Sequence, residues 1–306
     1  MRNLKFDLTV ETNALLCPNP QDFYSKSYIT PSVATDFRVV PGVKEATKLA
    51  SNTFESVLKT AGCAWSSTDS SLDAVDITVC KLDAMVEVCQ YDLESSFVAL
   101  QMAKGDANFA VASFMDFYWG ELSKEIEAEI QDIRWNGNTS LTGATYLKYC
   151  DGYLKKLDAS SSVVKLTGAT LSSANIVSAL TSVVTALPES IKGKKADVRI
   201  YMSAKNALLY QIAALGLNTG GNYTGELPAV FAGYQISVQE GMSDSYIVAS
   251  NKNNFVYAFD GEGDSKALKA VNLADTVAEP VIRTRAGIKV GFHLLNETEI
   301  VRFKAS

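Results

Sequence analysis

A long helix over residues 108–134 is the clearest element that the pattern of apolar and polar positions predicts. Its apolar residues are spaced three or four apart, which places them on one face of an α-helix. They are Met115, Trp119, Leu122, Ile126, Ile130 and Ile133. Such a helix is about 40 Å long at 1.5 Å per residue, and Asn136-Gly137-Asn138 ends it. Acidic residues such as Glu125 and Glu129 occupy its other faces, either as a solvated surface or as an electrostatic docking surface.

A strand with one apolar and one cationic face is predicted over residues 281–295. The even positions from Ile282 to Leu294 are apolar apart from Thr284. The odd positions include Arg283, Arg285, Lys289 and His293. Side chains alternate between the two faces of a strand, so one face is expected to cover a core and the other to be exposed. A short strand over residues 299–303 follows it.

Helices and strands alternate through the region from residue 141 onward. The helical pattern over residues 174–187 stops at Pro188, and the pattern over residues 204–215 stops at Gly216. Alternating or β-branched runs predict the strands 198–202, 229–239, 246–250 and 255–260. This order of elements is typical of an α/β unit.

The N-terminal third has a different pattern. In residues 1–42 the apolar positions are scattered and interrupted by Pro18, Pro20, Pro31 and Pro41, which predicts an extended arm. Residues 43–80 predict a wide hairpin with a polar tip and little apolar content of its own, and a short strand follows over residues 85–89. A hairpin of this kind is poorly stable alone and needs a surface to lean on.

Composition limits the possible classes of protein. The 306 residues suggest about two domains, and 47% hydrophobic with 20% charged residues is ordinary for a globular protein. No apolar run reaches the roughly 18 residues that a membrane span requires, and the N-terminus lacks the apolar core of a secretory signal. The net charge of −6 and the balanced charges of the arm disfavour tight binding to nucleic acid.

Candidate chemistry is sparse. The chain matches none of the common nucleotide, hydrolase, zinc or calcium motifs, so no catalytic, cofactor-binding or metal-binding residue is predicted. His293 is the one histidine, and its place on the cationic strand face predicts a surface or interface residue. The cysteines lack the spacing of a disulfide framework or a zinc site, so reduced thiols in a cytoplasm are expected. They are Cys17, Cys63, Cys80, Cys89 and Cys150.

The order of these parts resembles the major capsid proteins of tailed bacteriophages, which have the Hong Kong 97-type fold. Several stretches are similar to family motifs, including the entry to the peripheral domain, the end of the spine helix and the terminal strand. They are residues 80–96, 130–138, 196–203, 232–242 and 281–302. The chain departs from the family pattern by lacking two prolines in the region 234–243 and a helical scaffolding segment before the arm. No pair of residues is assigned to the family's Lys–Asn crosslink.

The resemblance implies an α+β, mixed α/β fold with four parts. They are an arm (1–42), an extended hairpin loop (43–80), a peripheral domain with a long spine helix (81–145 and 280–306) and an axial domain (146–279). It also implies a structural protein rather than an enzyme, one that assembles into hexamers and pentamers of an icosahedral head around double-stranded DNA. The candidate contacts between subunits are Glu125, Glu129, Arg283, Arg285 and Lys289.

The implied partners are copies of the chain itself, a portal, a separate scaffolding protein and packaged DNA that is contacted non-specifically at most. No cofactor is implied. The expected location is the virion, with assembly in the host cytoplasm. Two alternatives stay open: a nanocompartment shell of the encapsulin type, and a two-domain α/β enzyme that works without histidine.

Overall fold

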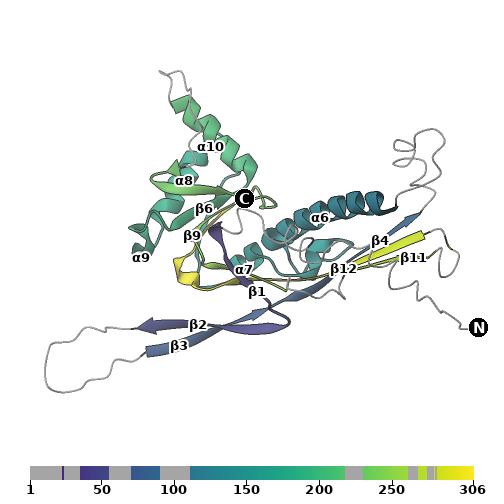
Figure 1. The fold of residues 1–306 in the computed structure, drawn as a ribbon. Coiled ribbons are helices and arrows are strands. Elements are labelled where there is room, and N and C mark those ends of the chain that lie inside the picture. The colour runs from purple at the N-terminus through teal and green to yellow at the C-terminus, as the bar shows by residue number, and fades with distance from the viewer. Residues whose placement is uncertain are drawn as a thin grey trace, which may run out of the picture.

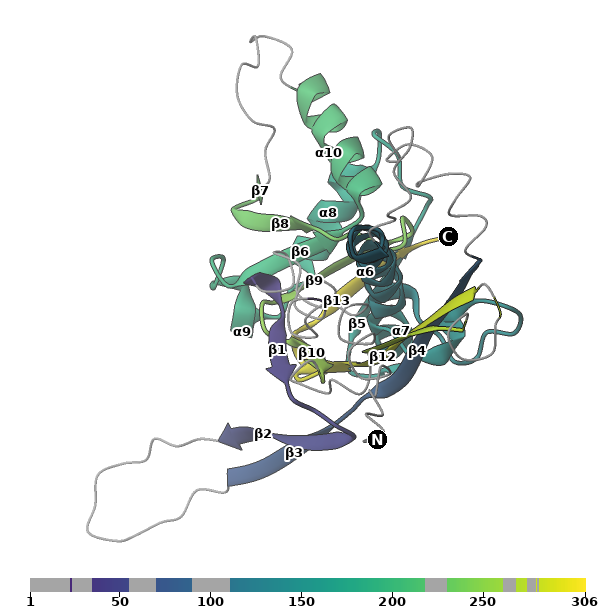
Figure 2. The same cartoon turned by 45° about the vertical axis from the view of Figure 1, so that its right-hand side comes forward.

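The structure, a computed structural model, describes residue 23 and residues 35–54, 70–89, 111–217, 230–260, 268–273, 279 and 281–306. Two β-sheets with helices packed on them form the body, and a two-stranded hairpin projects from one side (Figure 1 and Figure 2). The fold is therefore a mixture of α and β elements, as the sequence predicts.

The first sheet is organised by its longest strand, β12 (Val281–Leu294), which pairs antiparallel with β4, β10 and β11. The other strands of this sheet are β1 (Arg38–Pro41), β4 (Cys80–Cys89), β10 (Phe255–Phe259) and β11 (Leu268–Asn272). Every even-numbered side chain from Ile282 to Leu294 is buried, which confirms the predicted alternation.

Helix α6 (Val111–Asn136) packs its apolar face on this sheet (Figure 1). Of the predicted stripe, Trp119, Ile126, Ile130 and Ile133 are buried. The chain leaves the helix at Gly137, where an added Cβ would lie 2.5 Å from the Ile133 carbonyl oxygen and 3.0 Å from the backbone nitrogen of Gly152. The N–H of Gly152 donates to the Gly137 carbonyl at 2.8 Å, so the end of the long helix is fixed against the start of the next one.

The second sheet has the strand order β5-β13-β9-β6-β8-β7 and carries three helices. Its strands are β5 (Val164–Gly168), β6 (Val198–Met202), β7 (Val230–Phe231), β8 (Tyr234–Val238), β9 (Tyr246–Asn251) and β13 (Val301–Ala305). The remaining helices are η2 (Tyr146–Tyr149), α7 (Tyr153–Ala159), α8 (Ile176–Thr185), α9 (Glu189–Lys192), α10 (Ala204–Leu217) and η3 (Glu297–Glu299).

The elements predicted for this region agree with the structure except in two places. Helix α10 continues through Gly216 to Leu217. The single strand predicted over residues 229–239 is a hairpin, β7 and β8, with its turn at Ala232 and Gly233. Their φ angles are +52° and +88°, the positive values that a two-residue hairpin turn requires.

Sheet membership does not follow the expected division of the chain into domains, which stays a prediction. Strand β13 lies in the second sheet, between β5 and β9, and not with β12 as the range 280–306 implied. Conversely, β10 and β11 pair with β12 in the first sheet although they fall within the range 146–279. Hydrogen bonding between strands distant in sequence decides these assignments, and the local pattern of a strand does not encode its partner.

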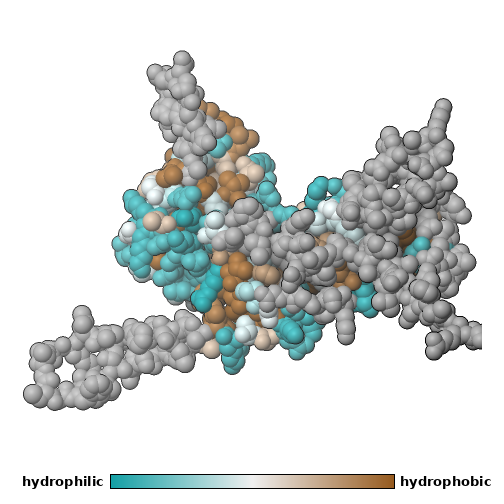
Figure 3. All heavy atoms as spheres, viewed as in Figure 1, coloured by the Kyte–Doolittle hydropathy of each residue, from teal (hydrophilic) through white to brown (hydrophobic). Residues whose placement is uncertain are grey.

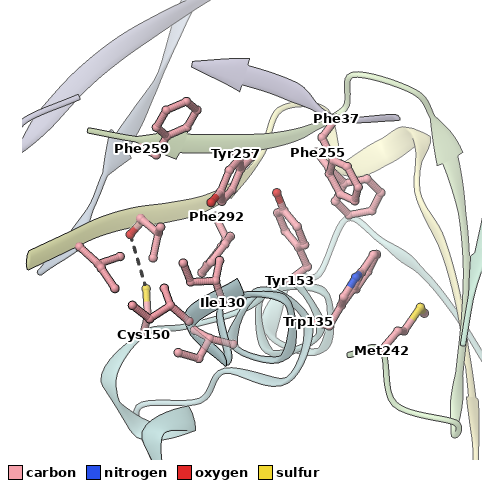
Figure 4. Packing of buried hydrophobic residues seen from close by; sticks show 14 of the residues in the cluster. Phe37, Ile130, Trp135, Cys150, Tyr153, Met242, Phe255, Tyr257, Phe259 and Phe292 are labelled. Carbon is pink, nitrogen blue, oxygen red and sulfur yellow. Dashed lines mark hydrogen bonds between the residues drawn. The ribbon is translucent and has the colours of Figure 1, made fainter. Parts of the chain in front are cut away.

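The two sheets meet at a cluster of aromatic rings (Figure 4). Tyr201 of β6 and Phe255 of β10 have ring centroids 5.2 Å apart, and Trp135 of α6 lies about equally close to both. Phe37 stacks on Tyr153 of α7 at 5.8 Å. These rings are buried, so the arm, the long helix and both sheets share one core.

The end of the predicted arm is part of this body. Strand β1 pairs in parallel with β10, and the buried carboxylate of Asp36 accepts a hydrogen bond from Ser237 and lies 3.4 Å from Arg199 Nε. Phe23 is buried against Trp119 at 5.4 Å. The other residues before Thr35 lie outside the described part of the chain.

The predicted hairpin consists of β2 (Ala46–Phe54) and β3 (Ser70–Thr78), which pair antiparallel. Its strands extend away from both sheets (Figure 2). The predicted polar tip, residues 61–71, lies outside the described part except for Ser70 and Ser71, which begin β3. At the root of the hairpin, Ile77 is fully buried with Val43, Val256 and Ala258. The hairpin is thus anchored at its base and projects beyond it.

Candidate subunit-contact surface

The predicted cationic face of β12 is exposed but already paired within the chain. Arg283 Nε lies 2.7 Å from a carboxylate oxygen of Glu87, and Arg285 binds Asp83 with two hydrogen bonds, at 2.8 and 3.2 Å. These hydrogen bonds raise the pKa of both arginines. Because the pairs are solvent-exposed, they contribute little to folding, and the same cations stay accessible to another molecule.

Lys289 also has an acidic partner. Its Nζ lies 2.7 Å from Asp260, whose side chain is only 7% exposed. The three predicted cations of β12 therefore face acids of β4 and of the segment after β10. Their contact with a neighbouring subunit stays a prediction.

The predicted acids of α6 are in a different state. Glu125 is exposed and Glu129 is partly buried, and neither forms an ion pair among the described residues. Partial burial and the charge of Glu125 raise the pKa of Glu129. Glu125 and Glu129 lie one helical turn apart and repel each other. A cation from another molecule would therefore stabilise this face.

The structure does not bring the two charged sets together. Helix α6 covers the face of the first sheet that carries the even side chains of β12, whereas Arg283 and Arg285 belong to the odd, exposed set. Side chains of successive residues in a strand point to opposite faces. Attraction between the acids of α6 and the arginines of β12 is therefore available between two molecules and not within one.

A groove beside the acids adds an apolar component to this surface. It has a volume of about 240 Å³ and is lined by Leu82, Ile126, Glu129, Ile130, Tyr146 and Tyr149, among others. The side chains of Tyr146 and Tyr149 are 38% and 58% exposed. A hydrogen bond to Asp132 raises the pKa of Tyr146 to about 12. The groove was not predicted, because no local pattern links β4 with the segment after α6.

Helix α10 carries a second surface that the sequence prediction missed. Leu208, Ile212 and Leu215 are 54%, 48% and 43% exposed and follow one face of the helix. Hydrophobic residues gather around α10 in the space-filling view (Figure 3). The signal was present in the sequence: residues 204–217 contain one charge, Lys205, and are otherwise mostly apolar on all sides, which is typical of a helix that is covered.

His293 is buried, which corrects the expectation of a surface or interface residue. Its Nε2 lies 3.0 Å from the backbone N–H of Thr78, and its Nδ1 lies 3.4 Å from Lys156 Nζ. Burial and the charge of Lys156 lower the pKa of His293. The end of β12 passes beneath the hairpin root, so an odd position that would otherwise be exposed is covered by a distant segment.

Two cysteines differ from the expected reduced thiols in this structure. Cys80 and Cys150 form a disulfide across 70 residues of sequence. Cys89 is a free, partly exposed thiol, and Cys17 and Cys63 lie outside the described residues. The bond depends on β4 lying beside the segment after α6, and spacing along the chain gives no indication of that proximity.

Other kinds of site are not found in the described part of the chain. No cluster of three or more histidine, cysteine or acidic residues there has the arrangement of a metal site. Among the described helices, none combines the length and the apolar character needed to cross a membrane.

Comparison with known proteins identifies solved structures but no related sequence. No protein-family model and no curated protein matches the chain. The capsid of the native GTA particle has a TM-score of 0.57 and 17% identity, with 99% of each chain covered. The satellite phage P4 procapsid, which includes the size determination (Sid) protein, has a TM-score of 0.61 and 8% identity, covering 98% of this chain and 99% of that one.

A virus-like particle from Pyrococcus furiosus is also similar, with a TM-score of 0.53 and 11% identity over 96% of this chain and 100% of that one. All of these are shell proteins, and each match extends over nearly the whole length of both chains. The chain has the α+β Hong Kong 97-type capsid fold.

Proposed function

We propose that this chain is the major capsid protein of a tailed bacteriophage, a structural subunit and not an enzyme. The observation that carries the proposal is the full-length match to capsid structures, 99% of both chains for the GTA particle. A match of this extent includes the projecting hairpin, the element that a self-contained enzyme does not need.

The hairpin supplies the mechanism of assembly. Lys48 and Asp76, paired across β2 and β3, have side chains 76% and 68% exposed, so among its described residues the hairpin gains little from its own body beyond the packing of Ile77 and Leu49. A two-stranded ribbon is marginal in water unless something packs against it. The hairpin then lies on a neighbouring subunit, and repetition of this contact around an axis builds hexamers and pentamers.

Charge complementarity orients these contacts. Among the described residues, Glu125 and Glu129 have no cation as a partner, and Arg283, Arg285 and Lys289 are paired with acids of their own chain. Opposite charges on two surfaces of one molecule favour one relative orientation of adjacent copies and speed their encounter. The net charge of −6 suits a shell that encloses double-stranded DNA and contacts it non-specifically at most.

The remaining partners follow from this role. A shell of this kind is built around a separate scaffolding protein, opens at a portal, matures to the virion and is assembled in the host cytoplasm. The units built on the first and second sheets act as the peripheral and axial domains.

Electron microscopy tests the proposal. The purified chain, alone and co-expressed with the products of neighbouring genes, should form capsomers or closed shells. A stable monomer of 33.0 kDa under all these conditions would contradict it and favour the histidine-independent enzyme.

A second candidate is a nanocompartment shell of the encapsulin type. The full-length likeness to the virus-like particle from Pyrococcus furiosus favours it. The contents of purified particles separate the two functions. Particles that protect DNA from nuclease support the phage head, whereas particles that retain an enzyme and no DNA support the nanocompartment.

A further inference from the structure

A disulfide lies at the root of the projecting hairpin, and none of the proposed subunit contacts uses it. Only Val79 separates Thr78, the last residue of β3, from Cys80, the first residue of β4. The disulfide partner of Cys80 is Cys150, which lies between η2 and α7. The bond therefore connects the point where the hairpin enters the first sheet to the segment that follows the long helix.

Besides the disulfide, the root has polar contacts and a small apolar cluster of Val43, Ile77, Val256 and Ala258, against which Val79 packs. The N–H of Val79 donates to the Glu45 carbonyl at 3.2 Å, and Lys81 forms an ion pair with Glu45 at 2.7 Å on exposed side chains. The buried contacts are those of Ile77 and the hydrogen bond of Thr78 with His293. Exposed ion pairs contribute little, so a covalent bond one residue from the hairpin adds a large constraint.

The two sulfurs differ in access. Cys150 is 2% exposed, whereas Cys80 is partly exposed at the start of β4. A small oxidant therefore reaches Cys80 first, and Cys150 is positioned to complete the exchange from within the fold. Cys89, at the other end of β4, has no such partner among the described residues.

We propose that Cys80 and Cys150 form a redox-dependent staple that controls how firmly the hairpin root is fixed to the body. The staple is open as two thiols in a reducing cytoplasm and closes under oxidising conditions. Its role in a shell rests on the proposed function: open subunits adjust the hairpin while they assemble, and closed subunits hold it.

The oxidant is a low-molecular-weight disulfide such as oxidised glutathione. The Cys80 thiolate attacks one sulfur of that disulfide, its S–S bond breaks, and one small thiolate leaves. The Cys150 thiolate then attacks the Cys80 sulfur and expels the second small thiolate. The two cysteines lose two electrons, the small disulfide gains them, and the two cysteine protons end on the two released thiols.

The redox test uses the full-length chain with Cys17, Cys63 and Cys89 replaced by serine. The folded protein is equilibrated in glutathione buffers of increasing oxidation, quenched with acid, alkylated and weighed by mass spectrometry. We expect two alkyl groups in reducing buffer and none in oxidising buffer. Alkylation of both cysteines in oxidising buffer would overturn the proposal.

A matched control adds Cys150→Ser to the same background. In this variant Cys80 should hold one glutathionyl group in oxidising buffer, because the second exchange cannot occur. Hydrogen–deuterium exchange of residues 74–79 should be slower by at least tenfold in the oxidised parent than in the reduced one, with no such difference in the control. Closing the 70-residue loop should also raise Tm by roughly 5–10 °C. Equal exchange in both redox states would contradict a role at the hairpin root.

The failure of this proposal is distinct from failure of the proposed function. If the chain forms no capsomers or shells but the cysteines titrate as a pair, the staple stands and the shell function does not. If shells form and their Cys80 and Cys150 stay reduced in oxidising buffer, the shell function stands and the staple is wrong.

Discussion

The aromatic core and the hairpin are stabilised in opposite ways. In the core, aromatic rings come from the arm, α6, α7 and both sheets. The centroids of contacting rings lie 4.9 to 6.1 Å apart, and the side chains are buried. In the hairpin, β2 and β3 pair with each other, and Lys48 and Asp76 remain largely exposed. The core is complete within one molecule, whereas the hairpin has a defined base and requires a second surface.

The largest effect is expected from a cavity in the core. Trp135 is fully buried and contacts four aromatic rings. Trp135→Ala should lower the free energy of unfolding by about 3–5 kcal/mol, measured by denaturant titration. Tyr149→Ala, at a side chain 58% exposed, is the control and should cost about 0.5 kcal/mol or less. Similar losses in the two variants would show that the rings are not the joint core of the body.

A smaller loss of stability is expected from removing the charge of Asp158, which links α7 to the second sheet through ion pairs. Its carboxylate lies 2.5 Å from Arg302, 3.0 Å from Lys304 and 2.8 Å from the Tyr246 hydroxyl, and Arg302 is buried. Asp158→Asn should lower the free energy of unfolding by about 1–3 kcal/mol, because Arg302 then loses its charged partner. Glu189→Gln removes an exposed pair with Lys192 and is the control. Equal stability of the two variants would contradict the role of Asp158.

The same carboxylate predicts a pH dependence. Burial raises the pKa of Asp158, but hydrogen bonds from Lys304 and Tyr246 and the charge of Arg302 outweigh it, so the pKa is lowered. Its contribution is fully present above the unfolded pKa, about 3.9, and is lost as the pH falls through the lower folded value. The stability of Asp158→Asn should fall less steeply in acid than that of the parent.

At the hairpin root, the lowered pKa of His293 leads us to expect that stability depends on pH in a milder range. Burial and Lys156 lower its pKa, so the folded state takes up the proton less readily than the unfolded chain, whose histidine titrates near 6.5. Stability should therefore decrease as the pH falls below about 6.5. His293→Gln keeps an acceptor for the Thr78 N–H. Chemical denaturation at several pH values between 5 and 7 should show that the stability of this variant depends less on pH than that of the parent. An unchanged slope would exclude His293 as its source.

Truncating the hairpin tests the comparison directly. Lys48 pairs with Asp76 across the two strands, so residues 49–75 can be replaced by an Asn-Gly turn that leaves Ile77 in place. The body should lose less than about 1 kcal/mol of stability in denaturant titration, while sedimentation shows that assembly is abolished. Shells that still form would show that the hairpin is not a contact element.

The smallest effect on folding is expected at the charged face of β12. The side chains of Arg285 and Asp83 are 56% and 34% exposed, so Arg285→Glu should leave the denaturation midpoint within experimental error. Assembly, followed by light scattering, should weaken with Arg285→Glu and with Glu125→Arg, and recover in part in the double variant. The control is a second double variant, Asp83→Lys with Arg285→Glu, which restores the ion pair within the chain with its charges reversed. If each single change leaves assembly untouched, electrostatic docking is wrong.

The sequence by itself determined the elements whose pattern is local and long. The stripe from Trp119 to Ile133 and the alternation from Ile282 to Leu294 specify a helix and a strand, because each periodicity places the apolar side chains on one face. The resemblance in the order of the parts predicted the capsid fold correctly, although no family model and no curated protein matches the chain.

The tertiary structure alone decided which distant segments meet. It placed β13 in the second sheet, buried His293 beneath Thr78 and joined Cys80 to Cys150. It also showed that the arginines of β12 have acids on the neighbouring strand. These contacts link residues more than 50 positions apart, and they depend on how complete elements pack. A local pattern specifies the face that an element buries, and the packing of the whole chain specifies what covers that face.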